Sequence, residues 1–418
     1  MLVQRKMKKQ LEKNELMKKI EKAIKSGKYL ITASHKKGSP PNDLHHFHSM
    51  HDYPNDDVER TMNKMTESVL SSIPGSKKTP HSKEFGKPSE QIIIKNWQSP
   101  GDILMLTAAV RDLKLSHPEI EIGIDTACKE LWENNPHITT FNEVKDIRTI
   151  HAEYPLIHFS NEGQYHFIHG YRQNLEDQLG LKIQPKKIVK EGNKEWEIPC
   201  SQFKGDIHIS EEEKKWMSQL EEQGVKEKFW IIMAGGKYDF TAKWNNPKTY
   251  QEVVDHFKGK IKFVQCGEKH HWHPKLKGVV NLIGKTNLRQ FIRLIYHSVG
   301  IVTPVSFAMH AAAAIESKHG LKNRPCVVIA GGREPVQWEA YPNHRFLSTN
   351  GCLPCCDNGG CWASRCQKIG DGDEKDKKSL CIKPVKISEN LYIPKCMDMI
   401  KPHHIIEAIE MYYDGGVL

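Results

Sequence analysis

The sequence contains no run of about 18 apolar residues, the length that a helix needs to cross a bilayer. Residues 1–30 are basic but lack the apolar core and small-residue cleavage site of a secretory signal peptide. Only 38% of the chain is hydrophobic, which is typical of a soluble protein. We therefore expect a cytoplasmic location, and 418 residues are enough for two domains of ordinary size with an appendage.

Motifs that recognise nucleic acid are also missing, although the formal net charge is +10. The charge is concentrated in residues 1–30, which hold ten Lys or Arg and three Glu. Apolar residues recur there at roughly helical spacing, which predicts a basic amphipathic helix. Such a helix either binds an anionic membrane surface or is solvated or packed against a partner. Nucleic acid is not an expected partner.

Cysteine, in contrast, is abundant and unevenly placed. Seven of the eleven cysteines fall within 45 residues near the C-terminus, at Cys352, Cys355, Cys356, Cys361, Cys366, Cys381 and Cys396. In a large chain without a secretion signal, this clustering favours metal or redox chemistry over a disulfide framework.

A basic N-terminal extension spans residues 1–90. Residues 34–90 are rich in Lys, Ser, Pro, His and Gly, which predicts an irregular segment. Four histidines in it either bind a metal or belong to a structureless patch: His45, His46, His48 and His51.

From residue 92 onward, short apolar runs alternate with segments of helical periodicity, which predicts parallel strands and crossover helices. The expected fold class is α/β, with two Rossmann-like, doubly wound domains facing a central cleft. We place them at 91–210 and 211–418, the second with a Cys-rich insertion at 351–396. Ligands of such sheets bind at the carboxyl ends of the strands.

Some elements of the first domain are short. The segment CKELWENNP, residues 128–136, reads as a helix. ITTF at 138–141 and LIHFS at 156–160 read as further strands.

Asp102 follows a strand and a Ser-Pro-Gly turn, in the first turn of a predicted helix. The carboxylate either caps this helix by accepting backbone N–H bonds or acts as a base toward an incoming hydroxyl. The residues of the second domain decide between these roles.

The loop MAGGKYDFTAKW, residues 233–244, is the first candidate there. Glycines permit close backbone approach, and hydroxyl and ammonium groups can bind a diphosphate. The alternative is a merely basic loop. The residues concerned are Gly235, Gly236, Lys237, Thr241 and Lys243.

Later strands carry further candidates. Glu268 either accepts bonds from ribose or sugar hydroxyls or is an exposed charge. Ser306 and His310 begin a small-residue helix whose positive end suits an anion, although a His beside alanines is usually a packing residue. Arg333 either binds phosphate or pairs with Glu334.

Three residues of the first domain are candidates for the acceptor side. His166, His169 and Arg172 either contact a phosphorylated or acidic acceptor or pack at the surface.

The sequence resembles family 9 glycosyltransferases, the ADP-heptose:lipopolysaccharide heptosyltransferase group, in five ordered segments. These are SPGDILMLTAAVRDLKLSHPEIEIGI, AGGKYDFTAKW, CGE, NLIGKTNLRQFIRLI and HAAAAI. The resemblance covers roughly residues 92–400 and leaves the N-terminal extension outside.

The resemblance implies a GT-B fold and an inverting transferase in which Asp102 is the general base. An acceptor hydroxyl would attack the anomeric carbon of ADP-heptose from the face opposite the leaving ADP. The implied acceptor is a lipopolysaccharide core, another glycan or a protein. The transfer needs no metal, because Lys243, Thr241 and the helix end near His310 can stabilise the diphosphate.

One motif departs from the family. Many members carry Asp-Thr-Gly shortly before the motif histidine, and here these places are Val305, Ser306 and Phe307. Another nucleotide sugar is therefore an alternative donor. A catalytically lapsed nucleotide-sugar-binding or assembly protein is an alternative function.

The cysteines have their own interpretation. Four thiolates can close a tetrahedral structural metal site, and reduced thiols or disulfides are the alternative. Some protein heptosyltransferases related to the family carry Cys-bound iron in the corresponding region. We therefore expect structural iron or zinc bound by Cys356, Cys361, Cys381 and Cys396. Cys355 could replace one of these ligands. A redox or metal-sensing protein is a third possible function.

Overall fold

The structure is a computed structural model, and it describes residues 91–141, 147–153, 166–184, 187–191, 194–198, 202–357 and 359–413. The predicted N-terminal extension lies outside these residues, with its basic helix and its four histidines. The predicted strand at 156–160 lies outside them too. Within the described residues, no helix combines the length and the apolar character that a membrane span requires.

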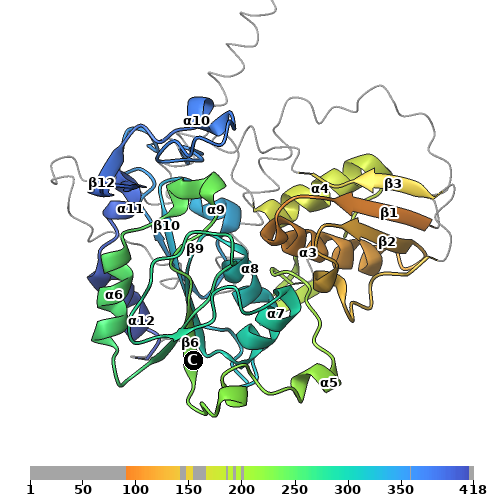
Figure 1. Ribbon diagram of the computed structural model, residues 1–418. Coiled ribbons are helices and arrows are strands. Elements are labelled where there is room, and N and C mark those ends of the chain that lie inside the picture. The colour runs from red at the N-terminus through yellow and green to blue at the C-terminus, as the bar shows by residue number, and fades with distance from the viewer. Residues whose placement is uncertain are drawn as a thin grey trace, which may run out of the picture. The chain divides into compact units, whose positions relative to one another are not determined.

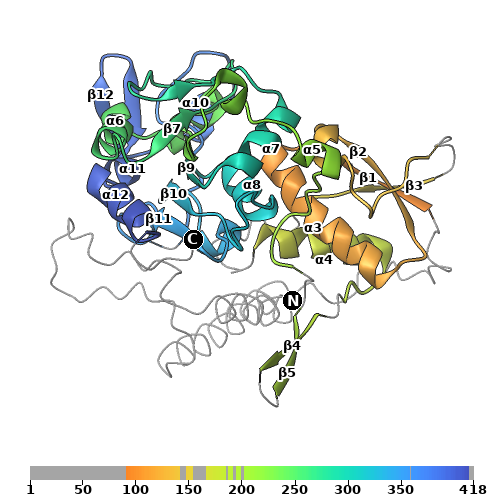
Figure 2. The ribbon, with the colours of Figure 1, turned by 90° about the horizontal axis from the view of Figure 1, so that it is seen from below.

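A three-stranded parallel sheet with the order β2-β1-β3 begins the described chain. Its strands are β1 (Gln91–Asn96), β2 (Glu121–Thr126) and β3 (Arg148–His151). The helices α3 (Pro100–Ser116) and α4 (Phe167–Leu179) pack on each other next to this sheet (Figure 1 and Figure 2). Every residue of α3 from Ile103 to Leu113 is buried, so this helix has no solvent face over three turns.

A six-stranded parallel sheet has the order β11-β10-β9-β6-β7-β8. Its strands are β6 (Phe229–Ile232), β7 (Lys262–Gln265), β8 (Val280–Asn281), β9 (Gly300–Pro304), β10 (Cys326–Gly331) and β11 (His344–Ser348). Its main helices are α6 (Pro247–His256), α7 (Leu288–His297), α8 (Phe307–Ala314) and α12 (Pro402–Glu410). The chain runs outward in both directions from the β6–β9 pair, which makes that pair the topological switch point.

Two sequence predictions are wrong. Residues 128–136 form only the 3₁₀ helix η2 (Lys129–Trp132), because Asn134 adopts a left-handed φ of 60° and a proline follows at 136. Residues 138–141 form no strand. Instead, Thr139 donates a single backbone hydrogen bond to the Ile122 carbonyl at the edge of β2.

Small elements complete the fold. They are the hairpin β4 (Lys187–Glu191) and β5 (Lys194–Ile198), α5 (Glu211–Lys214), η4 (Glu221–Gln223), η5 (Tyr238–Lys243) and α9 (Val336–Glu339). The Cys-rich segment contributes α10 (Lys375–Lys378), the hairpin β12 (Pro384–Ser388) and β13 (Leu391–Pro394), and α11 (Lys395–Asp398).

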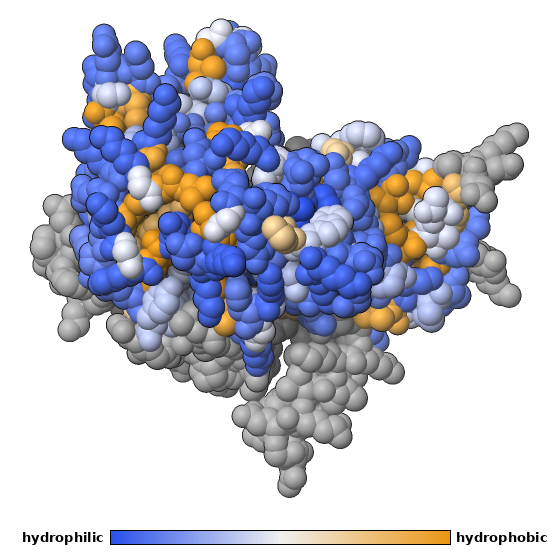
Figure 3. Space-filling view, turned by 60° about the horizontal axis from the view of Figure 1, so that its bottom comes forward, coloured by the Kyte–Doolittle hydropathy of each residue, from blue (hydrophilic) through white to orange (hydrophobic). Residues whose placement is uncertain are grey.

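The Cys-rich segment is organised around an ionic centre. The fully buried Arg365 donates hydrogen bonds to Asp371, Asp376 and Asp239 at 2.6 to 3.1 Å. Asp239 belongs to η5, so this arginine also holds the segment onto the loop after β6. The face of the molecule in Figure 3 is largely hydrophilic, with separate apolar patches.

Tyr412, just after α12, should be the C-terminal anchor of the second sheet. Its buried hydroxyl lies 2.5 Å from the Asn343 carbonyl oxygen and 3.1 and 3.2 Å from the backbone oxygen and nitrogen of Cys326. Tyr412→Phe leaves these buried groups without the hydroxyl. We expect the free energy of unfolding, measured in urea, to fall by about 1–3 kcal/mol.

Tyr413→Phe is the matched control. The Tyr413 side chain is half exposed, and its hydroxyl accepts one hydrogen bond from Trp230. Water can replace that bond, so the change should stay near 0.5 kcal/mol. Equal losses in the two variants would contradict the anchoring role of Tyr412.

Candidate active site

The loops after β6 and β9 meet at the switch point, where ligands of doubly wound sheets bind. The β6 loop leads through η5 to Lys243, and the β9 loop leads through Ser306 into α8. Ser306 caps α8 by accepting a hydrogen bond from the Ala308 N–H at 3.3 Å. The order of the strands thus brings together two of the sequence-predicted segments.

Asp102 lies in the first turn of α3 and is half-buried. Its Oδ2 accepts a hydrogen bond from the Ser99 N–H at 3.0 Å, so the carboxylate does cap this helix. The charge of Asp102 also acts on Lys243, whose pKa it raises. Capping therefore does not prevent the carboxylate from acting on groups of the second sheet.

Gly101 explains how α3 comes so close to the second sheet. A Cβ at this position would lie 3.0 Å from Cδ2 of His310 and 3.7 Å from Cα of Phe307. Both residues belong to the first turn of α8, and α3 and α8 are in contact. The glycine lets the two helix starts pack together, which places Asp102 beside the β9 loop.

Lys243 is the ammonium group at this junction. Its Nζ lies 2.8 Å from Oε1 of Glu334 and donates to the Val305 carbonyl at 3.3 Å. Burial and the neighbouring Arg333 lower the pKa of Lys243 to about 8, against the opposing charges of Glu339 and Asp102. An anionic ligand at this position would favour the charged form.

Two carboxylates near Lys243 did not stand out as site residues in the sequence. Glu334 is buried and also pairs with Arg333. Glu339 is buried at the end of α9, and burial raises its pKa while Lys243 and Arg333 oppose this shift. Glu339 lies in a four-residue helix that no sequence pattern marks.

Arg333 forms the ion pair with Glu334 that the sequence analysis gave as the alternative to phosphate binding. Its Nε donates to the Ala363 carbonyl at 2.7 Å, and its guanidinium lies over the rings of Phe240 and Trp362. Burial lowers the pKa of Arg333 to about 10. The arginine remains charged at neutral pH and adds positive potential next to Lys243.

His310 is a neutral, buried residue of the site. Its Nδ1 lies 2.8 Å from the Tyr341 hydroxyl, and its Nε2 lies 3.8 Å from Glu339. Burial, together with the Lys243 ammonium, holds the pKa of His310 well below its usual range. His310 can therefore position groups by hydrogen bonding, but it does not supply a positive charge.

His166 and His169 are buried, which corrects the alternative that they pack at the surface. Both rings are almost completely buried, and His166 lies against Tyr341 with ring centroids 5.0 Å apart. Burial lowers the pKa of His166 to about 3. Arg172, in contrast, is partly exposed and lies 3.7 Å from Glu176.

Other predicted donor residues are held by the fold. A Cβ at Gly235 would overlap with the Trp272 carbonyl oxygen, and the Gly236 N–H donates to that same oxygen at 2.9 Å. Thr241 is fully buried, and its hydroxyl accepts from the Cys366 N–H at 2.7 Å. Two further predicted donor residues are more exposed. Lys237 precedes η5 and is partly exposed, and Glu268 follows β7 and is exposed.

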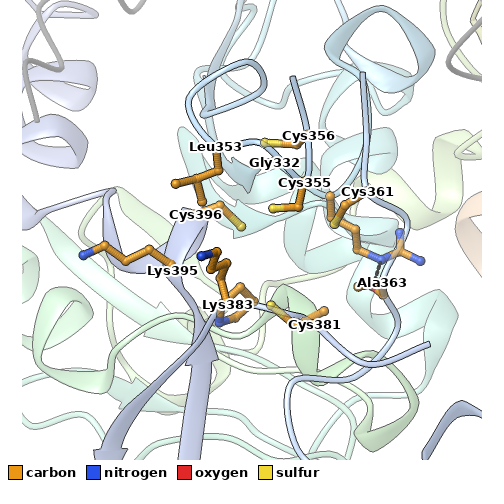
Figure 4. A pocket seen from close by; sticks show the side chains of 13 residues that line it. Gly332, Leu353, Cys355, Cys356, Cys361, Ala363, Cys381, Lys383, Lys395 and Cys396 are labelled. Carbon is orange, nitrogen blue, oxygen red and sulfur yellow. Dashed lines mark hydrogen bonds between the residues drawn. The ribbon is translucent and has the colours of Figure 1, made fainter. Parts of the chain in front are cut away.

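Five cysteines line one small cavity in the Cys-rich segment. Figure 4 shows Cys355, Cys356, Cys361, Cys381 and Cys396 around it. The cavity measures about 10 Å³, close to the space that one water molecule or ion fills. It contains all four predicted metal ligands and the substitute Cys355.

Burial raises the pKa of the Cys361 thiol, that of Cys356 to about 11 and that of Cys396 to about 12, whereas a hydrogen bond with Cys366 lowers the pKa of Cys381 to about 7. Backbone N–H groups of Gly332, Ala363 and Lys383 bond to Cys396, Cys361 and Cys381 respectively, and each such bond lowers the pKa of its thiol. Such N–H bonds are the outer-shell support that metal-bound thiolates need. Among the described residues, however, no three of these sulfur atoms lie within 4.8 Å of one another. Side-chain rotation would have to close the site around an ion.

Residues 166–359 match the sequence profile described as glycosyltransferase family 9 (heptosyltransferase). A glycosyl transferase family 9 structure from Veillonella parvula DSM 2008 has a TM-score of 0.50 at 14% identity. The match covers 78% of this chain and 98% of that chain. The profile identifies a glycosyltransferase domain at residues 166–359, and the α/β fold of two parallel sheets expected for the GT-B class is confirmed.

Two further solved structures are more distant. The dodecameric iron-containing heptosyltransferase TibC from enterotoxigenic E. coli, in complex with ADP-D-beta-D-heptose, has a TM-score of 0.48 at 15% identity. The match covers 78% of this chain and 76% of the TibC chain. E. coli ADP-heptose lps heptosyltransferase II has a TM-score of 0.43 at 16% identity, with coverages of 77% and 98%. No curated protein sequence matches the chain.

The resemblance to family 9 glycosyltransferases read from the sequence is confirmed by the matched profile. The matched segment begins at His166 and therefore includes Lys243 and His310 but not Asp102. The fold, rather than the profile, is what brings Asp102 to this site.

Asp102→Asn should lower the pKa of Lys243, because the carboxylate stabilises the ammonium form. We expect the midpoint of Lys243 deprotonation to move below about 8. Competitive acetylation across a pH series, read out by mass spectrometry of the Lys243 peptide, measures this midpoint.

Asp239→Asn is the control for this titration. Asp239 lies on the same loop as Lys243, but it pairs with Arg365 at 3.1 Å. The midpoint of Lys243 should stay unchanged in this variant. An unchanged midpoint in Asp102→Asn as well would show that the two groups do not interact.

Proposed function

We propose that this glycosyltransferase moves a heptose, or a related sugar, from ADP-heptose to a hydroxyl group with inversion at the anomeric carbon. One observation carries the proposal: the start of α3, which holds Asp102, packs against the start of α8, and Lys243 donates to the Val305 carbonyl in the loop that leads into α8. A base and a diphosphate-binding cation are the two groups that such a transfer needs on opposite sides of the sugar.

Asp102 is proposed as the general base. Its Oδ2 is engaged by the Ser99 N–H at 3.0 Å, which fixes the orientation of the carboxylate. The Asp102 carboxylate can take the proton of an acceptor hydroxyl as the hydroxyl oxygen attacks the anomeric carbon. The proton then resides on the carboxylate, and the bond between the anomeric carbon and the diphosphate breaks.

Lys243 and the start of α8 are proposed to bind the leaving diphosphate. The Lys243 ammonium is held by Glu334 at 2.8 Å, and a diphosphate would replace this carboxylate as its partner. The first N–H groups of α8 and the charge of Arg333 add to the positive potential. Preorganised groups of this kind each contribute on the order of 2.7–4 kcal/mol to lowering the barrier.

The donor sugar and the acceptor are less closely defined by the residues. Val305 and Phe307 stand where many family members have Asp and Gly, so contacts to the donor hydroxyls differ from the usual pattern. The same departure supports the alternative of a nucleotide-sugar-binding or assembly protein without turnover. We propose a lipopolysaccharide core, another glycan or a protein as acceptor, reached in the cytoplasm or at the inner face of the membrane through residues 1–30.

Cys356, Cys361, Cys381 and Cys396 are proposed to hold structural iron or zinc, with Cys355 in reserve. The support is the chemistry of the donor set, since thiolates around one ion-sized cavity suit both metals. A metal with four protein ligands keeps no open position for substrate. Its contribution when bound is to hold the Cys-rich segment together.

Asp102→Asn tests the base. The amide oxygen can still accept from the Ser99 N–H, so the helix cap and the stability should be kept. The rate of transfer from ADP-heptose should fall about 10²- to 10⁴-fold, while ADP affinity remains. Negligible turnover in the wild type and the variant alike, with ADP binding retained in both, would favour the binding-protein alternative.

A pH series tests Lys243. Its pKa of about 8 means that the ammonium is present below this value and is lost as the pH rises through it. We expect KM for the donor to rise above about pH 8 in the wild type. Lys243→Met should show a high KM at all pH values, without this inflection. An inflection that persists in Lys243→Met would assign it to another group.

Cys381→Ser and Cys396→Ser test the metal site. Each variant should lose one equivalent of iron or zinc relative to the wild type, measured by elemental analysis, and should unfold at lower temperature. Cys128→Ser is the control, because Cys128 lies beside β2, outside the cavity. Unchanged metal content in both cavity variants would exclude this site.

A further inference from the structure

A second group of metal-ligating side chains lies apart from the cysteines. His137, Asp206 and His208 each place one ligand atom within 4.8 Å of the other two. Nε2 of His208 lies 2.9 Å from Oδ2 of Asp206, and Nε2 of His137 lies 3.7 Å from the same oxygen. Two imidazole nitrogens therefore converge on one carboxylate oxygen.

We propose that His137, Asp206 and His208 bind a divalent transition-metal cation such as Zn²⁺. Imidazole and carboxylate are the ligands that such cations accept together, at about 2.0–2.2 Å from the metal. Neighbouring ligand atoms of a tetrahedral site then lie about 3.3–3.5 Å apart. The separations of 2.9 and 3.7 Å lie on either side of this value, so only small side-chain shifts are needed.

The ligands are already held by neighbouring groups. The Asp206 N–H donates to the Thr107 hydroxyl of α3 at 2.7 Å. The Asn135 side-chain amide donates to Oδ2 of Asp206 at 3.2 Å, and its oxygen accepts from the His137 N–H at 2.9 Å. One asparagine thus links two of the three ligands, as outer-shell residues of metal sites do.

A hydrogen bond between His208 and Asp206 alone explains less of this arrangement than a cation bound by all three residues does. A His208–Asp206 pair alone needs one imidazole N–H and leaves no role for a second histidine at the same oxygen. A cation would use a lone pair from each ring together with the carboxylate charge.

Arg111 is the charge that opposes the proposal, and its position limits its effect. It lies 3.8 Å from Oδ1 of Asp206, the oxygen that does not face the histidines. Its charge is shared with the buried Asp112 at 3.1 Å. Oδ2 is not paired with Arg111, and the side chains of His137 and His208 are 17% and 33% exposed, so a cation can enter from solvent.

The site lies where the chain passes from the first sheet to the second. Asp206 and His208 belong to the segment between β5 and α5, and His137 belongs to the loop after η2. Arg289 of α7 donates to the His208 carbonyl at 2.7 Å. A cation would therefore fasten the connecting segment to the first sheet's loop at the point where α7 also holds it.

The proposed cation has an architectural role. Thr107 and Arg111, which contact Asp206, follow Asp102 by five and nine residues in α3. At 1.5 Å per residue this is about 8–14 Å along the helix, too far for the cation to touch the groups that react at Asp102.

Zinc titration of the full chain, stripped with a chelator, tests the site. Wild type, Asp206→Asn and His208→Gln are titrated with Zn²⁺ against a chromophoric competitor. The cysteines and the histidines of 45–51 contribute equally to all three. We expect both variants to bind one Zn²⁺ fewer per chain, or to bind it about 10–100-fold more weakly. Thermal unfolding should show a smaller Zn²⁺-induced rise in the midpoint.

His256→Gln is the matched control. His256 is exposed and lies 2.9 Å from Glu410, the same kind of pair as His208 and Asp206, but without a third ligand. It should bind as much Zn²⁺ as the wild type. A loss equal to that of the site variants would attribute the effect to any histidine–carboxylate pair and overturn the proposal.

Two more variants keep the test decisive. His208→Cys retains a zinc ligand and should bind like the wild type, unlike His208→Gln. His137→Gln changes a separate loop and gives the same test if His208→Gln does not fold. Folded site variants, verified by circular dichroism, that bind Zn²⁺ with wild-type stoichiometry and affinity would refute the site.

Discussion

The contact between Gly101 and His310 is the constraint on which the site depends. A side chain at residue 101 would place its Cβ 3.0 Å from Cδ2 of His310, so the starts of α3 and α8 could pack this closely only if His310 shifted. Asp102 is the next residue, so its position relative to the second sheet is set by this packing rather than by its own hydrogen bond. In the Gly101-Asp102 motif, the glycine thus meets a steric requirement and the aspartate supplies the carboxylate.

The charges near this contact compensate one another in the absence of substrate. Lys243 pairs with Glu334, which also pairs with Arg333, while the buried Glu339 faces both cations. Breaking a buried pair by removing one partner leaves an uncompensated charge, which is costly. If a diphosphate replaces Glu334 at Lys243, as proposed, Glu334 keeps its pair with Arg333, so this buried carboxylate is not left without a cation.

Much of this fold could be predicted, and the misses have physical causes. The central strands of the second sheet are continuous apolar runs that alternate with helical segments, and the loops after them carry Lys243 and Ser306 to one edge of the sheet. The helix expected at 128–136 was lost because Asn134 and the following proline end it after one turn. Sequence periodicity cannot weigh such local backbone preferences against tertiary contacts.

Some site residues could also be predicted from the sequence and others could not. Asp102 and Lys243 stand in recognisable motifs, whereas Glu339 lies in the short helix α9 and enters the site only through tertiary packing. The five cysteines of the cavity are spread over 42 residues, and their convergence depends on the β12–β13 hairpin folding back on the segment. The group of His137, Asp206 and His208 joins segments about 70 residues apart and leaves no local pattern.

Ala242 belongs to the wall of the cysteine cavity, and the next residue along the chain is Lys243. Thr241, on the other side of Ala242, is tied to the Cys366 backbone. The width of the cavity and the position of the ammonium are therefore linked through a single peptide unit. A change in the shape of this cavity would therefore act directly on the backbone that carries Lys243.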